Sequence, residues 1–396
     1  MKKFLSKLQN VRGQDIEHIF LFLLAIIPSV WVRRKRPKMW LICEYGEEAR
    51  DNGYWFYKYV REAYPERDIV YAIKKSALDY QKIKPLGESV EYGSLKHWIY
   101  YLAADVNISS HKGGKPNAAV CYLLEVYGLL KNKRVFLQHG ITKDMAELFF
   151  YENTRMRLFI CGAQPEFDFV KKYFHYPEEN VVYTGFARFD QLQKIEGKRQ
   201  LLVVPTWRRW LYHSDSDPYS NTCREGITSE YYNKWYEFLS SDKLKRILEN
   251  YGYQLVFFPH RNATSLFETM KIDCDNIRVV DWKKSDLQIL MRESDCMITD
   301  YSSVAMDFSY MRKPLLYYQF DYDAYRQGHF AEGYFDYERD GFGKVVYCQE
   351  ELLEQLEAIL ENQCKIEEQY LERVNHFFKY HDTNNCERIY REIVKI

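Results

Sequence analysis

The sequence lacks the features of several large protein classes. Its 396 residues carry 56 Lys and Arg against 56 Asp and Glu, so the formal net charge is zero. Nucleic-acid-binding domains usually carry a basic surplus, and we therefore expect no nucleic-acid partner. The nine cysteines include no C-x-x-C pair. An odd number of scattered cysteines in a long chain argues against a disulfide framework and fits the reducing cytoplasm.

Common catalytic and cofactor motifs are missing as well. The sequence contains no G-x-G-x-x-G fingerprint, no Walker lysine motif and no H-E-x-x-H motif. A D-x-D pair, Asp215 and Asp217, lies in a long polar loop, which is a poor place for a rigid metal site. We therefore expect no metal requirement and no bound cofactor. Helix N-termini and the side chains of His and Arg can neutralise a leaving phosphate without a metal.

What is present indicates a globular chain with two α/β domains. Hydrophobic residues make up 46% and charged residues 28%, which is typical of folded proteins. The length suits two domains of roughly 150–200 residues. Short apolar runs alternate with segments of helical periodicity, and this alternation predicts a parallel sheet covered by helices. The alternation restarts near residue 200, after a polar stretch that contains Gly197.

We predict a GT-B-like α/β fold, with two Rossmann-like domains facing each other across a cleft. The first domain covers 38–195, and the second covers 196–396 with closing helices at its end. The predicted strands cover 39–44, 68–73, 89–92, 106–109, 134–138, 158–161, 181–184, 201–204, 254–258, 277–280, 296–299 and 314–318. The predicted helices cover 54–64, 94–103, 165–173, 230–250, 287–292, 303–311 and 352–379.

Residues 1–37 are predicted to form a separate, membrane-associating helical segment. The apolar run 19–31 is followed at once by the basic run 33–36. About 13 apolar residues fall short of the roughly 20 that span a bilayer, and Pro28 weakens a spanning helix. An apolar helix beside a polybasic patch predicts attachment to an anionic membrane surface. The alternative is a first helix docked on the core of the protein itself.

The most informative segment begins at a predicted strand that ends at Asp300. Ser302 and Ser303 then open a helix. Serine hydroxyls and unpaired backbone N–H groups at a helix N-terminus favour a pyrophosphate. Asp307 lies one turn further along and could reach a nucleotide ribose. An ordinary capped helix would show the same pattern, so that interpretation stays open.

Histidines follow two other predicted strands. His139 and Gly140 come after 134–138, where Gly140 permits a close approach of a ligand. A histidine has an ordinary pKa of roughly 6.5, so His139 is a candidate general base. Lys143 is a candidate phosphate ligand on the same loop. His260 follows 254–258 and could donate a hydrogen bond to a diphosphate. A hydrogen-bonded loop histidine is the alternative for both.

Polar side chains follow two further strands. Thr206 and Arg208 come after 201–204, and Gly185 and Arg188 come after 181–184. Arginine can bind two phosphate oxygens at once, although a solvated surface arginine is the common case. Ligands of α/β sheets bind beyond the carboxyl ends of the strands. The repeated occurrence of polar groups at strand ends therefore predicts a ligand site.

In this order the motifs resemble the CDP-glycerol:poly(glycerophosphate) glycerophosphotransferase family, the TagB/TagF-like enzymes of teichoic acid and capsule synthesis. The most specific match is the segment 298–303, I-T-D-Y-S-S, followed by Lys313 and Pro314. The segments 51–53, 139–140 and 333–336 are similar to further family elements. The resemblance covers roughly 38–346.

The resemblance implies a polyol-phosphate transferase that moves glycerol phosphate from CDP-glycerol to a lipid-linked polymer and releases CMP. It implies a peripheral location on the cytoplasmic face of the membrane. The implied site comprises His139 and His260 as catalytic residues and Ser302, Ser303, Asp300, Arg208 and Thr206 around the donor phosphates. The residues after Gly140, and Pro259 standing before His260, depart from the family pattern and leave the polyol open. Alternatives are a CDP-ribitol-dependent transferase, a GT-B glycosyltransferase and a non-catalytic scaffold.

Overall fold

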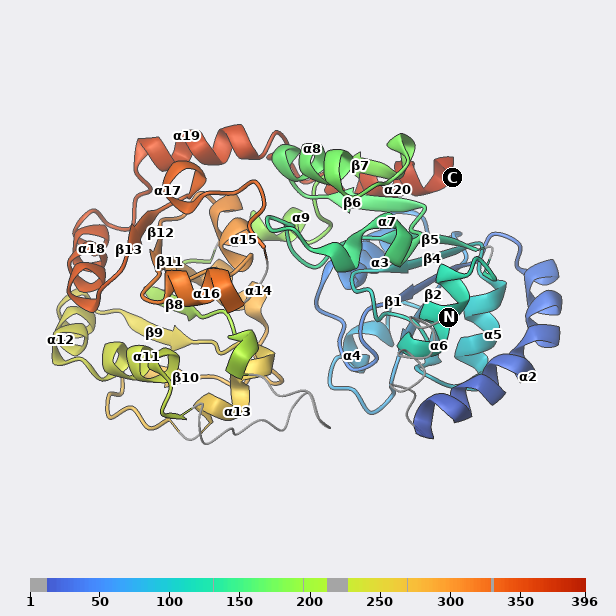
Figure 1. The fold of residues 1–396 in the computed structure, drawn as a ribbon, viewed down its shortest axis with the longest axis horizontal. Helices are drawn as coiled ribbons and strands as arrows, with labels where there is room; N and C mark the ends of the chain where they lie inside the picture. The colour runs from blue at the N-terminus through green and yellow to red at the C-terminus, as the bar shows by residue number, and fades with distance from the viewer. Residues whose placement is uncertain (1–12, 131, 195, 212–226, 269, 329–330) are drawn as a thin grey trace. The chain divides into compact units, whose positions relative to one another are not determined.

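The computed structural model describes residues 13–130, 132–194, 196–211, 227–268, 270–328 and 331–396. These residues form two compact units, each built on its own parallel β-sheet (Figure 1). Unit 1 contains the described residues up to Ile141, together with Glu147–Asp190 and Asp382–Ile396. Unit 2 contains Thr142–Ala146 and Gln191–His381. The prediction of two parallel-sheet α/β units is confirmed. Asp215 and Asp217 lie outside the described residues.

The sheet of unit 1 has seven parallel strands in the order β3-β2-β1-β4-β5-β6-β7. The strand order reverses at β1, which has β2 on one side and β4 on the other. In open α/β sheets such a reversal marks the place where ligands bind. The strands are β1 (Trp40–Cys43), β2 (Ile69–Ile73), β3 (Ser89–Glu91), β4 (Val106–Ser109), β5 (Lys133–Phe136), β6 (Leu158–Cys161) and β7 (Val181–Tyr183).

Helices cover this sheet, and several begin at a polar cap predicted by local sequence. Asp51, Ser94 and Asn117 each accept a backbone N–H of the first helical turn. The helices of unit 1 are α2 (Gly13–Lys35), α3 (Asn52–Ala63), α4 (Tyr80–Ile83), α5 (Leu95–Ala103), α6 (Ala118–Val126), α7 (Tyr151–Thr154), α8 (Gln164–Tyr173) and α20 (Asn385–Lys395), with α9 (Phe189–Leu192) where the chain passes to unit 2.

Helix α2 is longer than the apolar run that predicted it. It continues through Pro28, and by length and composition its stretch Asp15–Lys35 could cross a membrane, a test that buried core helices and signal sequences also pass. One face packs on α5, where the indole of Trp98 donates to Nδ1 of His18 (3.0 Å). The docked-helix alternative is therefore correct for this face. The other face exposes large apolar side chains, among them Phe20, Leu23, Leu24, Ile27, Val30 and Trp31.

The sheet of unit 2 has six parallel strands in the order β10-β9-β8-β11-β12-β13. Its order reverses between β8 and β11, which pair with each other. Trp235 and Phe238 pack against this sheet in the core of the unit. The sequence pattern did not predict β13. The strands are β8 (Gln200–Val204), β9 (Gln254–Phe257), β10 (Ile277–Val279), β11 (Ser294–Thr299), β12 (Leu315–Tyr318) and β13 (Lys344–Val346).

The single helix predicted for 230–250 is wrong. Ser241 has extended backbone between two helices, and its hydroxyl accepts the N–H of Leu244 (3.4 Å), so it caps the second helix. The helices of unit 2 are α11 (Glu230–Ser240), α12 (Asp242–Tyr251), α13 (Thr264–Phe267), α14 (Leu287–Glu293), α15 (Val304–Tyr310), α16 (Tyr322–Gly328), α17 (Tyr337–Asp340), α18 (Gln349–Glu361) and α19 (Glu368–Phe377).

The last helix does not belong to the second domain, as the predicted range 196–396 assumed. Helix α20 packs in unit 1, where the carboxylate of Asp190 accepts the backbone N–H groups of Asn385 (2.9 Å) and Cys386 (2.9 Å). The hydroxyls of Tyr59 and Tyr64 both donate to Glu387, each at 2.7 Å. These long-range contacts have no periodicity along the sequence, and the pattern of apolar runs could not indicate them.

Candidate functional site

His139 lies where the sequence predicted, directly beyond the carboxyl end of β5. Its side chain is exposed, while Leu137 and Gln138 before it are buried. The ring centroid of His139 is 4.9 Å from that of His111 and 6.1 Å from that of Phe149. Gly140 follows it in the same turn. This edge of unit 1 therefore presents an imidazole to solvent next to the place where the strand order reverses.

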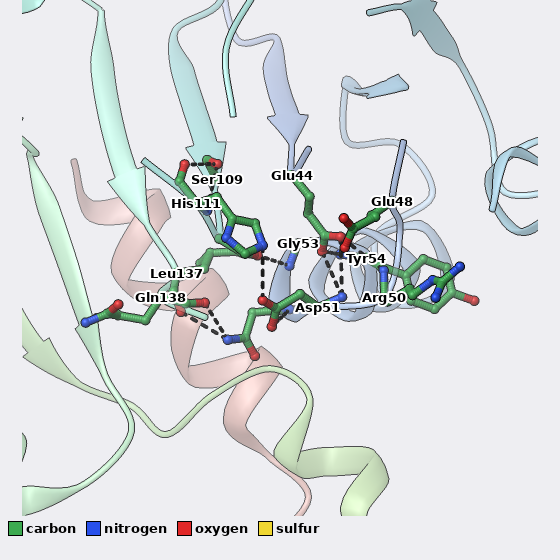
Figure 2. A network of polar contacts seen from close by, with 12 residues as sticks. Glu44, Glu48, Arg50, Asp51, Gly53, Tyr54, Ser109, His111, Leu137 and Gln138 are labelled. Carbon is green, nitrogen blue, oxygen red and sulfur yellow. Dashed lines mark hydrogen bonds and ion pairs between the residues drawn. The ribbon is translucent and has the colours of Figure 1, made fainter. Parts of the chain in front are cut away.

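Asn52 holds the turn that carries His139. Gln138 has left-handed backbone with φ of 62°, which is uncommon for a residue with a side chain. The side-chain amide of Asn52 donates to the carbonyl oxygens of Gln138 (2.7 Å) and Leu137 (3.3 Å) (Figure 2). The amide oxygen of Asn52 accepts the backbone N–H of Arg188 (3.0 Å). The segment 51–53, noted in the sequence only as a family-like motif, thus fixes the position of the proposed base.

Glu44 follows β1 and stabilises the start of α3. Its carboxylate accepts the backbone N–H groups of Arg50 (3.0 Å), Asp51 (3.1 Å) and Tyr54 (2.7 Å) (Figure 2). A side chain at Gly53 would meet this carboxylate at 2.9 Å, so only glycine fits there. Burial, with the charge of Asp51 as a second cause, raises the pKa of Glu44 to about 8.

Asp51 joins the end of β1 to the end of β4. One carboxylate oxygen accepts Nη1 of the buried Arg188 (2.5 Å), and the other is 3.4 Å from Nε2 of His111. Burial raises the pKa of Asp51, and the guanidinium of Arg188 opposes that shift. His111 and Asp51 were not among the predicted site residues. His111 closely follows β4, and that position was the signal that could have identified it, whereas Asp51 caps α3 within the family-like segment 51–53.

In unit 2, Ser302 and Ser303 lie at the N-terminus of α15, directly beyond β11. The hydroxyl of Ser302 accepts the N–H of Val304 (3.3 Å), and the side chain of Ser303 makes no capping hydrogen bond. Both residues are half-buried, and their predicted contact with the donor phosphates stays a prediction. Asp307 is buried within the helix. Its predicted contact with a ribose stays a prediction that this burial does not favour.

Arg208 and Asp300 are buried together, in contrast to the expected direct contact with a phosphate. The guanidinium of Arg208 lies 2.9 Å from the carboxylate of Asp300 and 2.7 Å from that of Asp321, and neither Arg208 nor Asp300 has an exposed side-chain atom. Asp300 also accepts the backbone N–H groups of Thr206 (2.8 Å) and Tyr301 (2.6 Å). Because these charges are already paired, the arrangement favours a supporting role, in which Arg208, Asp300 and Thr206 hold the loop before Ser302.

The pKa values of Asp300 and Arg208 are both raised in this buried cluster. Burial raises the pKa of Asp300, and the neighbouring Arg208 opposes the shift. Burial alone would lower the pKa of Arg208, but Asp300 and Asp321 outweigh it and raise the value. Through its contacts to Asp300 and Asp321, Arg208 connects the ends of β8, β11 and β12.

His260 and Lys143 differ in what they can offer a ligand. His260 is half-buried beyond β9, with its ring 6.0 Å from that of Trp207, and its Nδ1 accepts the N–H of Asn262 (3.1 Å). Lys143 is buried and paired with Asp144, which also contacts Arg326 (3.1 Å). The predicted phosphate contact of Lys143 stays a prediction. The pairing with Asp144 does not favour it, because it already neutralises the charge of Lys143 inside unit 2. Among the described residues, no group of three or more His, Cys, Asp or Glu side chains is arranged to hold a metal ion.

Comparison with known proteins identifies relatives of the whole chain. The minor teichoic acid biosynthesis protein GgaB of Bacillus subtilis (strain 168) is 32% identical over 383 residues, which cover 94% of this chain and 41% of GgaB. A teichoic acid poly(glycerol phosphate) polymerase of Staphylococcus epidermidis is 23% identical over 359 residues, covering 84% of this chain and 46% of the polymerase. The chain thus spans less than half the length of these two relatives.

Solved structures share the fold. The wall teichoic acid polymerase TagF superposes with a TM-score of 0.66 at 17% identity, over 98% of this chain and 97% of that one. A putative UDP-N-acetylglucosamine 2-epimerase from Listeria monocytogenes superposes with a TM-score of 0.54 at 16% identity, over 90% and 96%. At such identities the likeness concerns the fold alone. The family model of the CDP-glycerol:poly(glycerophosphate) glycerophosphotransferases matches residues 26–395, and the chain belongs to that family.

Proposed function

We propose that the chain transfers glycerol phosphate from CDP-glycerol to the hydroxyl end of a lipid-linked, teichoic acid-type polymer and releases CMP. The observation that carries the proposal is His139, an exposed imidazole at the carboxyl edge of the unit 1 sheet, on a turn that Asn52 holds in place. Family membership supports the reaction class. Relatives named as a poly(glycerol phosphate) polymerase and as GgaB support the polymer, and TagF was studied with CDPG.

The proposed step is a displacement at phosphorus. The terminal hydroxyl oxygen of the acceptor forms a bond to the β-phosphorus of CDP-glycerol, and the bond from that phosphorus to the bridging oxygen breaks. CMP leaves with the electron pair of that bond, and His139 takes the proton of the hydroxyl. General-base assistance of this kind contributes about 10²–10⁴ in rate. The rest of the catalysis comes from position and from neutralised charge.

Unit 2 is the proposed donor-binding unit. Ser302 and Ser303 would meet the diphosphate with hydroxyl and backbone N–H donors at the start of α15. His260 would donate a further hydrogen bond from the end of β9. The buried ion pair of Arg208 with Asp300 would keep the backbone of this turn in place. Donors fixed before the substrate arrives need no reorganisation during the reaction.

The deciding experiment compares donors. Purified protein is incubated with a polymer-primed acceptor and with CDP-glycerol, CDP-ribitol or UDP-sugars, and release of CMP or UDP is measured. We expect CMP release that depends on CDP-glycerol and on acceptor. Release of UDP alone would contradict the proposal and indicate a glycosyltransferase. No turnover with any donor would leave the scaffold alternative. Addition of EDTA tests the expected independence from metal, with undiminished release as the expected result.

CDP-ribitol is the second candidate donor because of a specific observation. Two ribitol-phosphate polymerases of Staphylococcus aureus, TarL and TarK, are 24% and 23% identical over parts of this chain. The same phosphate and histidine contacts would serve either polyol. The ratio of kcat/KM for the two donors decides between them, and we expect it to favour CDP-glycerol.

Attachment to the cytoplasmic face of the membrane through α2 is part of the proposal. Phe20, Leu24 and Ile27 lie at helical spacing on the exposed face, and Ile27 is 82% exposed. Fewer side chains of the basic run 33–36 are available to an anionic membrane surface than the sequence suggests. Arg36 pairs with Asp68 and Glu88. The polar atoms of Arg33 donate to the last carbonyls of α5. The exposed apolar stripe therefore carries most of the proposed affinity.

Cosedimentation with phosphatidylglycerol vesicles tests this attachment. The double substitution L24S/I27S should reduce the bound fraction strongly, because each buried side chain of this type contributes roughly 1.5–3 kcal/mol. Leu78→Ser is the matched control, since Leu78 is 69% exposed elsewhere in unit 1. Equal binding of L24S/I27S and of the control would contradict membrane attachment through α2. The donor experiment above does not depend on this result.

A further inference from the structure

His111 stands beside His139 and has no part in the function proposed above. It follows β4, and its backbone N–H donates to Oγ of Ser109 (3.0 Å), which fixes the start of its loop (Figure 2). Its side chain is 13% exposed. The ring stacks on that of Tyr45, with 4.1 Å between the ring centroids. The ring centroids of His111 and His139 are 4.9 Å apart, with 30° between the ring planes. Two imidazoles thus meet at the switch point of unit 1.

A carboxylate orients one of these two imidazoles. Nε2 of His111 is 3.4 Å from the carboxylate of Asp51, and that carboxylate is fixed from other sides. It accepts the guanidinium of Arg188 (2.5 Å) and the N–H of Asn52 (2.7 Å). A carboxylate in contact with an imidazole favours the protonated ring. Asp51 therefore stabilises a positive charge on His111, next to His139.

We propose that His111 is a positioning residue for His139, which it holds in place and keeps in the neutral, proton-accepting form. The proposal rests on the proposed function, in which His139 is the base. Neighbouring like charges repel, so a proton on His111 disfavours a second proton on His139. Only a neutral imidazole can take the proton of the acceptor hydroxyl. The charge on His111 would thus extend the activity of His139 to lower pH.

The groups around the two rings are consistent with this assignment. Tyr45 stacks on the ring of His111. Glu44, whose raised pKa keeps it protonated below about pH 8, lies behind Asp51 and leaves Asp51 as the carboxylate that faces His111. Phe136 and Phe149 face His139 and carry no charge. The amino group of Lys112 donates to the carbonyl of Leu148 (2.9 Å), which fixes its position beside this loop.

His111→Phe is the informative substitution. Phenylalanine keeps an aromatic ring between Tyr45 and His139 but loses the contact to Asp51 and the charge. We expect kcat for CMP release to fall on the order of 10–100-fold, with the KM for donor within about twofold, because misplacing a catalytic group by ~1 Å costs roughly that much. The acid limb of the kcat profile should move to higher pH. If His111 only packed against its neighbours, phenylalanine would replace it without a loss of kcat or a change in the pH profile.

His111→Asn and His175→Asn form a matched pair. His175 also contacts a carboxylate, that of Glu152 (3.3 Å), but it is exposed and precedes β7, at the edge of the sheet where the strands begin. His175→Asn should leave kcat and its pH profile unchanged. His111→Asn should lower kcat as the phenylalanine variant does. Thermal unfolding of all three variants shows whether each is folded.

NMR titration of the full chain, with labelled histidine, tests the coupling without any turnover. The His139 resonance should titrate at higher pH in His111→Phe than in the wild type, and the two wild-type imidazoles should show coupled, two-step curves. An unchanged His139 midpoint overturns the proposal whatever the turnover, and so does a normal kcat in His111→Phe. If both His111 variants are unfolded, the wild type decides the question. Independent, single-step titration curves for His111 and His139 in the wild type then overturn the proposal. If no donor yields CMP, the proposed function fails, and the titration still decides the coupling.

Discussion

In unit 1 two histidines, His111 and His139, lie next to each other beyond β4 and β5, and His139 is open to solvent, whereas in unit 2 Arg208 and Asp300, beyond β8 and β11, are buried and paired. His139 is exposed and His111 is held by Asp51. Arg208 and Asp300, at the equivalent edge of unit 2, have no exposed side-chain atoms. Both edges lie at a reversal of strand order. The same sheet geometry can therefore either present a proton acceptor or stiffen a turn.

The difference teaches that charge at a strand end has two uses. A charge that must react stays accessible and has an adjustable protonation state. A charge that organises the backbone is buried, because a fully paired ion inside the protein fixes geometry more firmly than one in water. Unit 2 then offers a ligand hydroxyls and backbone N–H groups at Ser302 and Ser303. The following predictions test this division, from the largest expected effect to the smallest.

His139→Ala should lower turnover by about 10²–10⁴-fold while the thermal midpoint changes little, because an exposed side chain contributes little to packing. CMP release and thermal unfolding are measured on the same preparation. Near-normal turnover in the folded variant would show that His139 is not the general base. The contrast drawn between the two units would then fail.

Arg208→Ala should destabilise the protein by roughly 3–5 kcal/mol, because it leaves Asp300 and Asp321 buried without a partner. Denaturant unfolding measures the loss. Arg339→Ala is the matched control, since Arg339 is paired with Asp340 on the surface and such exposed pairs contribute little to stability. Equal stability of the two variants would show that the buried pair of unit 2 is not structural.

Ser302→Ala should weaken CDP-glycerol binding by about tenfold, the order expected for one hydrogen bond to a charged group, and should change the stability only slightly. Calorimetry of donor binding is the measurement. Ser229→Ala removes the capping serine of α11, whose hydroxyl accepts the N–H of Tyr232 (3.2 Å), and serves as control. An unchanged dissociation constant for Ser302→Ala, or an equal loss in both variants, would contradict donor binding at α15.

The prediction for Glu44 concerns only the slope of stability against pH. Its pKa is raised to about 8 in the folded protein, so between its ordinary unfolded value and about 8 the folded state holds a proton that the unfolded state has lost. The contribution of Glu44 to stability is therefore present at low pH and is lost as the pH rises through about 8. Glu44→Gln should flatten the dependence between about pH 5 and pH 8 in denaturant unfolding. An unchanged slope would contradict this assignment.

The sequence predicted what depends on short-range pattern. β4 and β6 were predicted at their observed bounds: β6 is a continuous apolar run, and in β4 apolar residues alternate with Asn107 and Ser109. Serines 302 and 303 were expected at a helix start because caps and strand ends are local features. His139 was identified because it follows a strand. In each case the neighbouring residues alone determine the structure.

What the sequence could not show depends on residues far apart in the chain. Asp51 contacts Arg188, which is 137 positions away, and Arg208 contacts Asp321, which is 113 away. Only the fold reveals that one arginine of the predicted set is neutralised internally and that His111 stands next to His139. The left-handed backbone at Gln138 was equally invisible, because nothing in the sequence distinguishes this glutamine from one with ordinary backbone.

The return of α20 to unit 1 has a consequence for synthesis of the protein. Most of unit 1 is synthesised before Gln191–His381 of unit 2, and Asn385–Lys395 only after both. Until that segment emerges, Asp190 lacks its partners and the ring of Tyr64 lacks Tyr390, on which it stacks at 3.8 Å. Unit 1 therefore cannot complete its folding in the order of translation, and a nascent chain stalled before residue 385 should remain open to proteases in its first half.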